Sequence, residues 1–442
     1  MVPVIRSLRP ARLNSVYALS RALGQAGLRR IPLSEDTAVL CEPVRLCGRL
    51  IPNRMAVQPM EGFDAGAGGA PGPTTFQRYE AYAAGGAGLI WFESAAVSPD
   101  GMDSPHQLSI SRGTLSEFRA LTQAVNRARI QCWGEPPVKL LQLTHSGRAS
   151  QPRPLTAFPN PYLDPYSPVP PAVVSDRELD ALAEQTFQAA LLARRAGFDG
   201  VDLKCCHNYL FRELLAGFTR SGVYGGSFHN RTRFLLELVD RIRTAAGPQF
   251  LISVRLNAYD SVPYPYGWGM VQEDGVMRPD LSEPKRLIRL LEERGVRLFN
   301  ITSMFPRVAP TGEGFPALFR QDSEILPFEG MDALLRAMRE LKQAAPRSIF
   351  VGTGLSWFER FAPNVGAGGI KRGCFDVAGF GRMALAYPGF FTRVLRGDTL
   401  DPSRCCVTCD GCYRCMEAGG PVVCVLRHAR PGGPDERKER LP

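Results

Sequence analysis

The sequence contains no run of about 18 apolar residues, the minimum that a membrane-spanning helix needs. It also has no secretory signal, no internal repeat and no low-complexity segment in its body. We therefore expect a globular protein without a membrane span, located in the cytoplasm.

Two nucleotide-binding motifs are absent as well. The chain has no G-x-x-x-x-G-K-[ST] sequence, which excludes a P-loop nucleotide hydrolase. No G-x-G-x-x-G sequence follows a predicted strand, so a built-in Rossmann domain for NAD or FAD is not expected.

Acidic residues are missing from residues 1–34, which carry six arginines and therefore a charge of +6. Residues 427–442 carry five basic and three acidic residues, so the two ends hold most of the formal charge of +10. The body is nearly neutral and has no basic stripe interleaved with aromatic residues, so we expect no nucleic acid as a partner. For residues 1–34 we prefer a frayed extension over a transit-like or membrane-touching segment.

Strand-like apolar runs alternate with helical patterns along the body of the chain. This alternation predicts an α/β protein with a parallel sheet, and eight such units close as a (β/α)8 TIM barrel. A short hairpin is expected just before the first of these strands. The predicted strands are residues 55–59, 88–94, 138–143, 200–204, 250–256, 297–302, 348–354 and 376–382.

The carboxyl ends of the strands are where a barrel binds its ligands. The fourth strand runs into a polar group that includes Lys204, His207 and Tyr209. His207 and Tyr209 are two residues apart, so in a strand they would point the same way. Hydrogen-bond donors aimed at one spot suit a substrate oxygen that gains charge, and a tyrosine beside them suits a proton donor.

Other strand ends indicate an anionic cofactor at the same face. Arg382 could contact a phosphate together with backbone N–H groups of the last two strands. Gln142 offers a donor and an acceptor to the edge of a heterocycle, and the buried Arg255 needs an anionic or carbonyl partner. The glycines that would approach the phosphate are Gly352, Gly354 and Gly381.

Half of the twelve cysteines lie within residues 405–424. That density in a large chain is typical of metal ligation and not of disulfides. Spacing alone fits zinc as well as an iron–sulfur cluster, and by itself it favours zinc. The clustered cysteines are Cys405, Cys406, Cys409, Cys412, Cys415 and Cys424.

The predicted organisation has four parts. Residues 1–40 form a basic N-terminal extension, and residues 41–400 form the barrel. Residues 401–430 form a cysteine-rich metal-binding segment, and residues 431–442 form a flexible tail.

Six blocks of sequence occur in order along the chain: NRMAVQPM, RYEAYAAGGAGLIWFES, QLTHSGR, FDGVDLKCCHNYL with SGVYGGSFHNRTRF, VRL, and VAGFGRMALAYP. Together they resemble the Old Yellow Enzyme family of FMN-dependent ene-reductases. The cysteine segment is similar to the iron–sulfur branch of that family, which includes 2,4-dienoyl-CoA reductase and trimethylamine dehydrogenase.

The resemblance implies a place for each cofactor. Pro59 and Met60 would line the FMN ring, Ser94 its polar edge, Gln142 its pyrimidine side, and Arg255 its N1/O2 edge. The phosphate would lie against Gly352, Gly354, Gly381 and Arg382. A 4Fe–4S cluster, rather than zinc, would be held by Cys406, Cys409, Cys412 and Cys424.

The resemblance also implies a reaction. Reduced FMN would transfer hydride to the β-carbon of an activated alkene, and Tyr209 would protonate the α-carbon. Lys204 and His207 would hold the carbonyl oxygen; Lys204 stands where the family commonly has histidine, and could favour a carboxylate. Electrons would come from NAD(P)H directly or through the cluster from a separate reductase or ferredoxin. Homo-oligomers are common among barrels of this family.

Two alternatives stay open. One is an amine or alcohol dehydrogenase, in which the acidic pair Glu61 and Asp64 would bind a cationic substrate. The other is a flavin-free barrel with a structural zinc site, acting as a binding module. His145 and Arg148 are candidates for direct contact or for a conformational role, and residues 205–206 are reactive thiols or, preferably, core filling.

Overall fold

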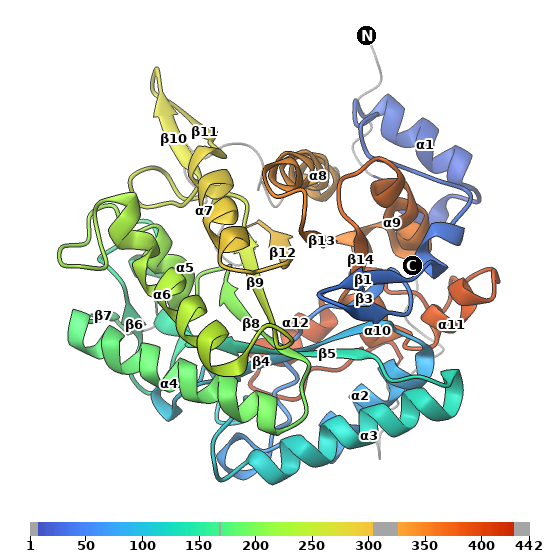
Figure 1. The fold of residues 1–442 in the computed structure, drawn as a ribbon. Coiled ribbons are helices and arrows are strands. Elements are labelled where there is room, and N and C mark those ends of the chain that lie inside the picture. Colours follow the sequence, from blue (N-terminus) through green and yellow to red (C-terminus); the bar gives the residue numbers. More distant parts are fainter. Residues whose placement is uncertain (1–7, 168, 304–325, 428–442) are drawn as a thin grey trace.

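The computed structural model describes residues 8–167, 169–303 and 326–427. Its centre is a closed barrel of eight strands, all of them parallel to their neighbours (Figure 1). The prediction of a (β/α)8 barrel is therefore confirmed. In order around the barrel the strands are β3 (Met55–Val57), β4 (Leu89–Ala96), β5 (Val138–Thr144), β8 (Gly200–Cys205), β9 (Leu251–Asn257), β12 (Leu298–Thr302), β13 (Ile349–Gly352) and β14 (Val377–Phe380).

Helices surround the barrel and connect its strands. Every residue of β4, β5 and β9 is buried, because helices cover the outer face and side chains fill the interior. A capping box starts α4, in which Ser175 and Glu178 each accept from the other's backbone N–H. The surrounding helices are α2 (Pro73–Gly85), α3 (Leu115–Trp133), α4 (Asp176–Arg195), α6 (Phe228–Ala246), α7 (Ser282–Glu293), α8 (Leu326–Ala344) and α9 (Ala362–Lys371).

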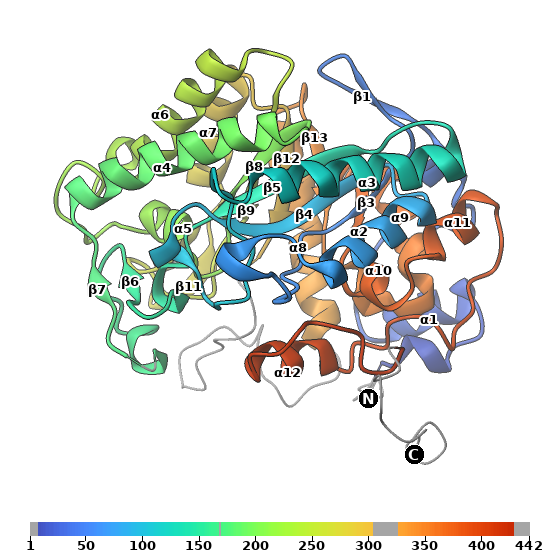
Figure 2. The same cartoon turned by 90° about the horizontal axis from the view of Figure 1, so that it is seen from below.

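A hairpin closes one end of the barrel. Strands β1 (Val44–Leu46) and β2 (Arg49–Ile51) pair antiparallel, as predicted. Leu46 and Ile51 pack with residues near the beginnings of the barrel strands, such as Leu89, in one apolar cluster. Figure 2 shows this hairpin and the short helix α12 (Gly411–Glu417) at opposite ends of the barrel. Ligands must therefore reach the barrel from the carboxyl ends of its strands.

The N-terminal extension packs against the barrel. Helix α1 (Val16–Gln25) buries Leu19 and Leu23 in the main core, and its apolar face is therefore covered by protein. Gly368 of α9 approaches the extension so closely that a Cβ there would lie 2.7 Å from the Leu33 nitrogen. The prediction of a frayed extension is wrong for residues 8–34, because these apolar contacts fix the segment. Residues 1–7 and the predicted tail 431–442 lie outside the described residues.

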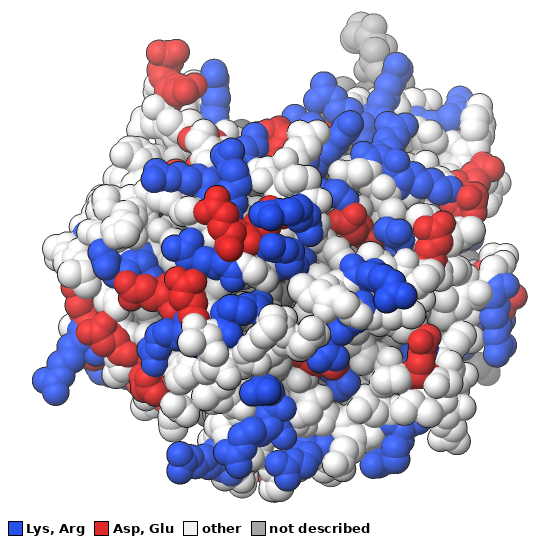
Figure 3. All heavy atoms as spheres, viewed as in Figure 1, with Lys and Arg blue, Asp and Glu red and all other residues white. Residues whose placement is uncertain are grey.

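Charged side chains of both signs cover the surface. Figure 3 shows acidic and basic groups intermixed over much of one face, with basic groups gathered over α1, α8 and α9. Among the helices that the structure describes, none has the length and apolar character needed to cross a membrane.

Candidate functional site

Three strands bring a buried lysine, a carboxylate and two hydroxyl groups together at the open end of the barrel. The Lys204 ammonium lies 2.5 Å from Glu61 Oε1 and 2.9 Å from Ser94 Oγ. Ser94 also donates to Glu61. The same ammonium lies 3.5 Å from the centroid of the Tyr209 ring. We call Glu61, Ser94, Lys204 and Tyr209 the Lys204 cluster.

The charge of Lys204 is compensated inside the protein. Its side chain is only 2% exposed, and that of Glu61 is 15% exposed. Burial would raise the pKa of the Glu61 carboxyl, but the Lys204 ammonium and hydrogen bonds from Lys204 and Ser94 outweigh burial and hold that pKa well below its usual range. The cluster therefore contains an ion pair and no uncompensated cation for a carboxylate substrate.

The Tyr209 hydroxyl faces two carboxylates. It lies 3.3 Å from Glu61 Oε1 and 3.4 Å from Asp103 Oδ2. Tyr209 precedes the short helix α5 (Leu210–Leu215), and Asp103 belongs to the loop after β4. Asp103 was not among the predicted site residues, although its place after a strand end is the signal that could have indicated it.

His207 has a constrained backbone. Strand β8 ends at Cys205, and His207 has a φ of 57°, in the left-handed region. The prediction that His207 and Tyr209 lie in one strand and point the same way is wrong, because this residue breaks the alternation. Its N–H donates to Asn257 Oδ1 at 3.0 Å, which helps hold a conformation that costs about 1–3 kcal/mol. The rings of His207 and Tyr209 lie 6.4 Å apart.

A fully buried ion pair supports Asn257 from behind. Asp260 pairs with Arg212, and neither side chain is exposed. Asp260 also accepts from Asn257 Nδ2 at 2.7 Å and from the Trp268 backbone N–H at 2.6 Å. This network, which links β9 to α5, was not predicted, since nothing local in the sequence marks two distant residues as partners.

The predicted flavin side of the site contains Gln142, Arg255 and a third buried polar residue, Asp202. Gln142 Nε2 donates to Asp202 Oδ2 at 2.7 Å. The acceptor Oε1 of the same amide therefore points away from Asp202. Arg255 Nη1 donates to the Pro59 carbonyl at 3.4 Å, and its Nε is buried without a partner in the described part of the chain. An unpaired donor on a buried cation fits an acceptor-rich ligand such as the edge of a flavin ring.

Asp202 makes the stability of the fold depend on pH. Burial raises its pKa to about 6, although hydrogen bonds, chiefly from Gln142, and the Arg255 charge oppose the shift. Because the folded protein then holds a proton that the unfolded chain has lost, Asp202 destabilises the fold progressively as pH rises from about 4 to about 6.

We therefore expect the Asp202→Asn variant to gain stability relative to the wild type between pH 4.5 and pH 7.5. The gain should be about 2 kcal/mol, because most of the free-energy effect of a shift of about two pKa units develops within this pH range. Urea unfolding of both proteins at the two pH values measures it. A stability difference that does not change with pH would contradict a raised pKa for Asp202.

The glycines predicted to approach a phosphate lie at the ends of β13 and β14. Gly354 has a φ of 79°, and a Cβ there would lie 2.3 Å from Met331 Sδ, so the position requires glycine for packing as well. A Cβ on Gly381 would lie 3.1 Å from Met60 Sδ, which places two predicted FMN contacts side by side. Gln58, at the end of β3, donates to the Gly352 carbonyl at 3.1 Å and so joins β3 to β13.

Arg382 faces the cysteine segment. It begins α10 (Arg382–Ala386) directly after β14, pairs with Asp410 Oδ1 at 2.6 Å, and lies 4.6 Å from the centroid of the Trp357 ring. Its guanidinium also lines the cysteine pocket. The predicted role as a phosphate ligand stays a prediction.

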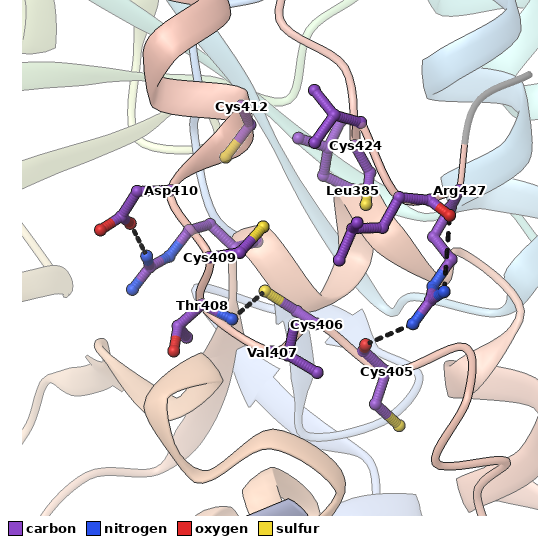
Figure 4. A pocket seen from close by; sticks show the side chains of 13 residues that line it. Leu385, Cys405, Cys406, Val407, Thr408, Cys409, Asp410, Cys412, Cys424 and Arg427 are labelled. Carbon is purple, nitrogen blue, oxygen red and sulfur yellow. Dashed lines mark hydrogen bonds and ion pairs between the residues drawn. The ribbon is translucent and has the colours of Figure 1, made fainter. Parts of the chain in front are cut away.

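The cysteine segment forms a pocket beside α10 (Figure 4). Cys415 is not among the lining residues, and the Cys405 thiol lies 3.3 Å from the Asp401 carbonyl. Arg382 and Arg427 line the same pocket and supply positive charge next to potential thiolates. The thiols that line it include the four predicted ligands Cys406, Cys409, Cys412 and Cys424.

The donor set of the pocket fits a metal centre, because four thiols from two segments face one space. Within residues 8–167, 169–303 and 326–427, no group of three ligating side chains has metal-binding geometry. Burial also raises the pKa of Cys406 to about 11, so this thiol is protonated before any metal binds.

Other candidate residues have structural partners. Arg148 bonds Glu213 at 2.5 Å and Asp164 at 2.7 Å. His145 is buried, which lowers its pKa to about 4, and its Nδ1 accepts from the Gly147 N–H at 3.1 Å. These contacts favour the conformational role for both residues.

The remaining acidic and thiol candidates are also accounted for. Asp64 is in an ion pair with Arg78, which also bonds the buried Glu93 at 2.6 Å. Cys205 and Cys206 are fully buried, and burial raises the pKa of Cys206 to about 11. These thiols therefore fill the core and are poor nucleophiles.

A family model described as the NADH:flavin oxidoreductase / NADH oxidase family matches residues 39–267. The NADH oxidase of Thermoanaerobacter brockii is 28% identical over 395 residues, which are 87% of this chain and 54% of that protein. The NADPH dehydrogenase of Halalkalibacterium halodurans is 30% identical over 279 residues, which are 61% of this chain and 74% of that protein.

Solved structures share the fold. A complex of 2-naphthoyl-CoA reductase with 2-naphthoyl-CoA superposes with a TM-score of 0.71 at 20% identity, covering 88% of this chain and 57% of that one. An old yellow enzyme homologue from Zymomonas mobilis superposes with a TM-score of 0.60 at 20% identity, covering 82% of this chain and 94% of that one. This chain thus spans little more than half the length of the T. brockii oxidase and of the 2-naphthoyl-CoA reductase.

Proposed function

Because this chain belongs to the NADH:flavin oxidoreductase / NADH oxidase family, we propose that it is an FMN-dependent reductase of activated alkenes or enoyl compounds. When bound, FMN would supply the hydride that the protein's own side chains cannot. The observation that carries the proposal is the position of Tyr209, whose hydroxyl lies at the open end of the barrel among charged partners. A positioned phenol is a competent general acid for a carbon that has just received hydride.

The residues of the chain divide between two tasks. Gln142 and Arg255 would hold the flavin, since one amide acceptor on β5 and one incompletely satisfied guanidinium on β9 lie on either side of β8. His207 and Tyr209 would meet the substrate, with His207 holding the acceptor oxygen whose negative charge grows during the reaction. The related 2-naphthoyl-CoA reductase makes an unsaturated thioester a reasonable acceptor class.

An anaerobic spectrum and a turnover assay test this proposal. Purified protein should show flavin absorbance that NADH or NADPH bleaches, and an α,β-unsaturated ketone should restore the colour. If no α,β-unsaturated ketone or thioester reoxidises the flavin, the proposed reaction is contradicted, but the proposed flavin site is not.

The amine dehydrogenase alternative has less support from this site. A cationic substrate needs a carboxylate to bind it, and the acidic pair suggested by the sequence is already engaged. Glu61 is paired with Lys204, and Asp64 with Arg78. The related histamine dehydrogenase and amine oxidase structures are 20% identical and share the fold.

We further propose that the cysteine pocket holds a 4Fe–4S cluster that relays electrons to the flavin. Support comes from four thiols around one pocket and from Arg382, which connects that pocket to the end of β14. NAD(P)H would act directly at the barrel mouth, or a separate reductase or ferredoxin would deliver the electrons through the cluster. The competing proposal is a structural zinc ion.

We expect Cys412→Ser to lose most of its iron and acid-labile sulfide, because it removes one of four ligands. Cys415→Ser is the matched control, since Cys415 lies on the same helix but does not line the pocket. Iron, sulfide and zinc are measured in anaerobically purified protein. Stoichiometric zinc without sulfide in the wild type would contradict the cluster.

A further inference from the structure

The three N–H donors of Lys204 all have neighbours within the protein. One faces Glu61 Oε1 at 2.5 Å, and one faces Ser94 Oγ at 2.9 Å. The remaining side of the ammonium faces the Tyr209 ring, whose centroid is 3.5 Å away. A lysine ammonium has three donors, so these contacts account for all of them and leave none for a substrate oxygen. With 2% of its side chain exposed, Lys204 is shielded from solvent by these neighbours.

A cation against the face of an aromatic ring interacts with the electrons of that ring. The attraction is worth about 2 kcal/mol or more when the pair is desolvated, and it grows when the ring becomes negatively charged. The Lys204 ammonium therefore favours the phenolate of Tyr209 over the neutral phenol.

Other groups around Tyr209 act on the same proton. The Glu61 and Asp103 carboxylates lie 3.3 Å and 3.4 Å from the hydroxyl, and both favour retention of the proton. The His207 ring, a further titratable group, is centred 6.4 Å from the Tyr209 ring. With two carboxylates at the oxygen, a buried cation is needed to keep Tyr209 a usable acid.

We propose that Lys204 is a positioning residue that acts through Tyr209: its buried ammonium strengthens Tyr209 as the acid, and Glu61 and Ser94 hold that ammonium against the ring. This inference rests on the proposed alkene reduction and assigns Lys204 a different role from that of an oxyanion ligand. In the protonation step the Tyr209 O–H bond breaks and a C–H bond forms at the α-carbon, after hydride from the reduced flavin has reached the β-carbon. The O–H electron pair stays on Tyr209 as phenolate beside the ammonium, and a solvent proton restores the phenol.

Titration of Tyr209 itself tests the proposal without any substrate. Protein labelled with ¹³Cζ-tyrosine is titrated by NMR, and Tyr209→Phe identifies the Tyr209 resonance. We expect Tyr209 to lose its proton at a pH lower by about one unit or more in the wild type than in Lys204→Met. Lys285→Met, which removes a partly exposed lysine paired with Glu340, should leave the titration unchanged. Equal titration in the wild type and Lys204→Met would overturn the proposal.

A second pair of variants guards against misfolding. Lys204→Met leaves the Glu61 carboxylate buried without its cation, whereas Glu61→Gln and the double variant Glu61→Gln/Lys204→Met do not. Glu61→Gln and the double variant differ only in the Lys204 cation, so Tyr209 should titrate at a pH lower by about one unit or more in Glu61→Gln than in the double variant. Identical titrations would reject the role of Lys204.

Turnover with an α,β-unsaturated ketone separates the two roles of Lys204. If Lys204 acts through Tyr209, Lys204→Met lowers kcat and moves the alkaline limb of its pH profile upward, with KM unchanged. A raised KM with an unmoved pH profile would instead assign Lys204 to substrate binding. Absence of flavin in the wild type would refute the proposed function, while the Tyr209 titration would still report on the ammonium.

Discussion

Replacing Tyr209 with phenylalanine should slow alkene reduction by about 10²- to 10⁴-fold, the usual contribution of a positioned general acid. The variant keeps the ring that packs against the Lys204 ammonium and removes only the hydroxyl that faces Glu61 and Asp103. Binding of the flavin and its reduction by NAD(P)H should therefore be unchanged.

Stopped-flow spectroscopy measures the two half-reactions separately. Flavin bleaching by NAD(P)H reports the reductive half, and recovery of the colour on addition of an α,β-unsaturated ketone reports the oxidative half. Tyr17→Phe is the control, because Tyr17 is 66% exposed on α1. An oxidative half-reaction as fast in Tyr209→Phe as in the wild type would eliminate Tyr209 as the proton donor.

Replacing Asp260 with alanine should lower the free energy of unfolding by about 3–5 kcal/mol. The change leaves the Arg212 guanidinium as an unpaired charge in a fully buried position. It also removes the acceptor of the Trp268 N–H and of Asn257 Nδ2. Because Asn257 in turn holds the left-handed backbone of His207, a weaker substrate site should accompany the loss of stability.

Chemical denaturation of the two proteins measures this effect, and a surface pair provides the control. Asp240 lies 3.2 Å from Arg294 with 54% of its side chain exposed, so Asp240→Ala should cost no more than about 1 kcal/mol. A loss for Asp260→Ala as small as that of the control would show that Arg212 finds another partner or is not charged.

The barrel could be predicted because its strands are buried on both faces. Such strands appear in the sequence as apolar runs, like VKLLQL in β5, whatever their neighbours are. The helices between them follow from their amphipathic patterns, and the hairpin before β3 from its turn. The packing of α1 was not predicted, because Leu19 and Leu23 are too few to indicate which surface covers them.

The candidate site was predictable in its location and less so in its contacts. Strand ends indicated one edge of the barrel for Lys204 and Tyr209, since parallel strands carry such residues to one edge, and the structure brings Ser94 to them as well. The pairing of Lys204 with Glu61 depends on loop conformation, which local sequence does not determine. The left-handed backbone of His207 is likewise fixed by a distant residue, Asn257.

The hairpin β1–β2 closes one end of the barrel, so that end has a structural role and the other end binds ligands. Leu46 and Ile51 close the hairpin end of the barrel through apolar contacts, so substitutions of these two residues lower the stability of the fold. At the other end, loops of independent length carry the side chains that meet ligands. Changes in those loops would therefore alter the substrate, while the barrel and its closed end stay the same.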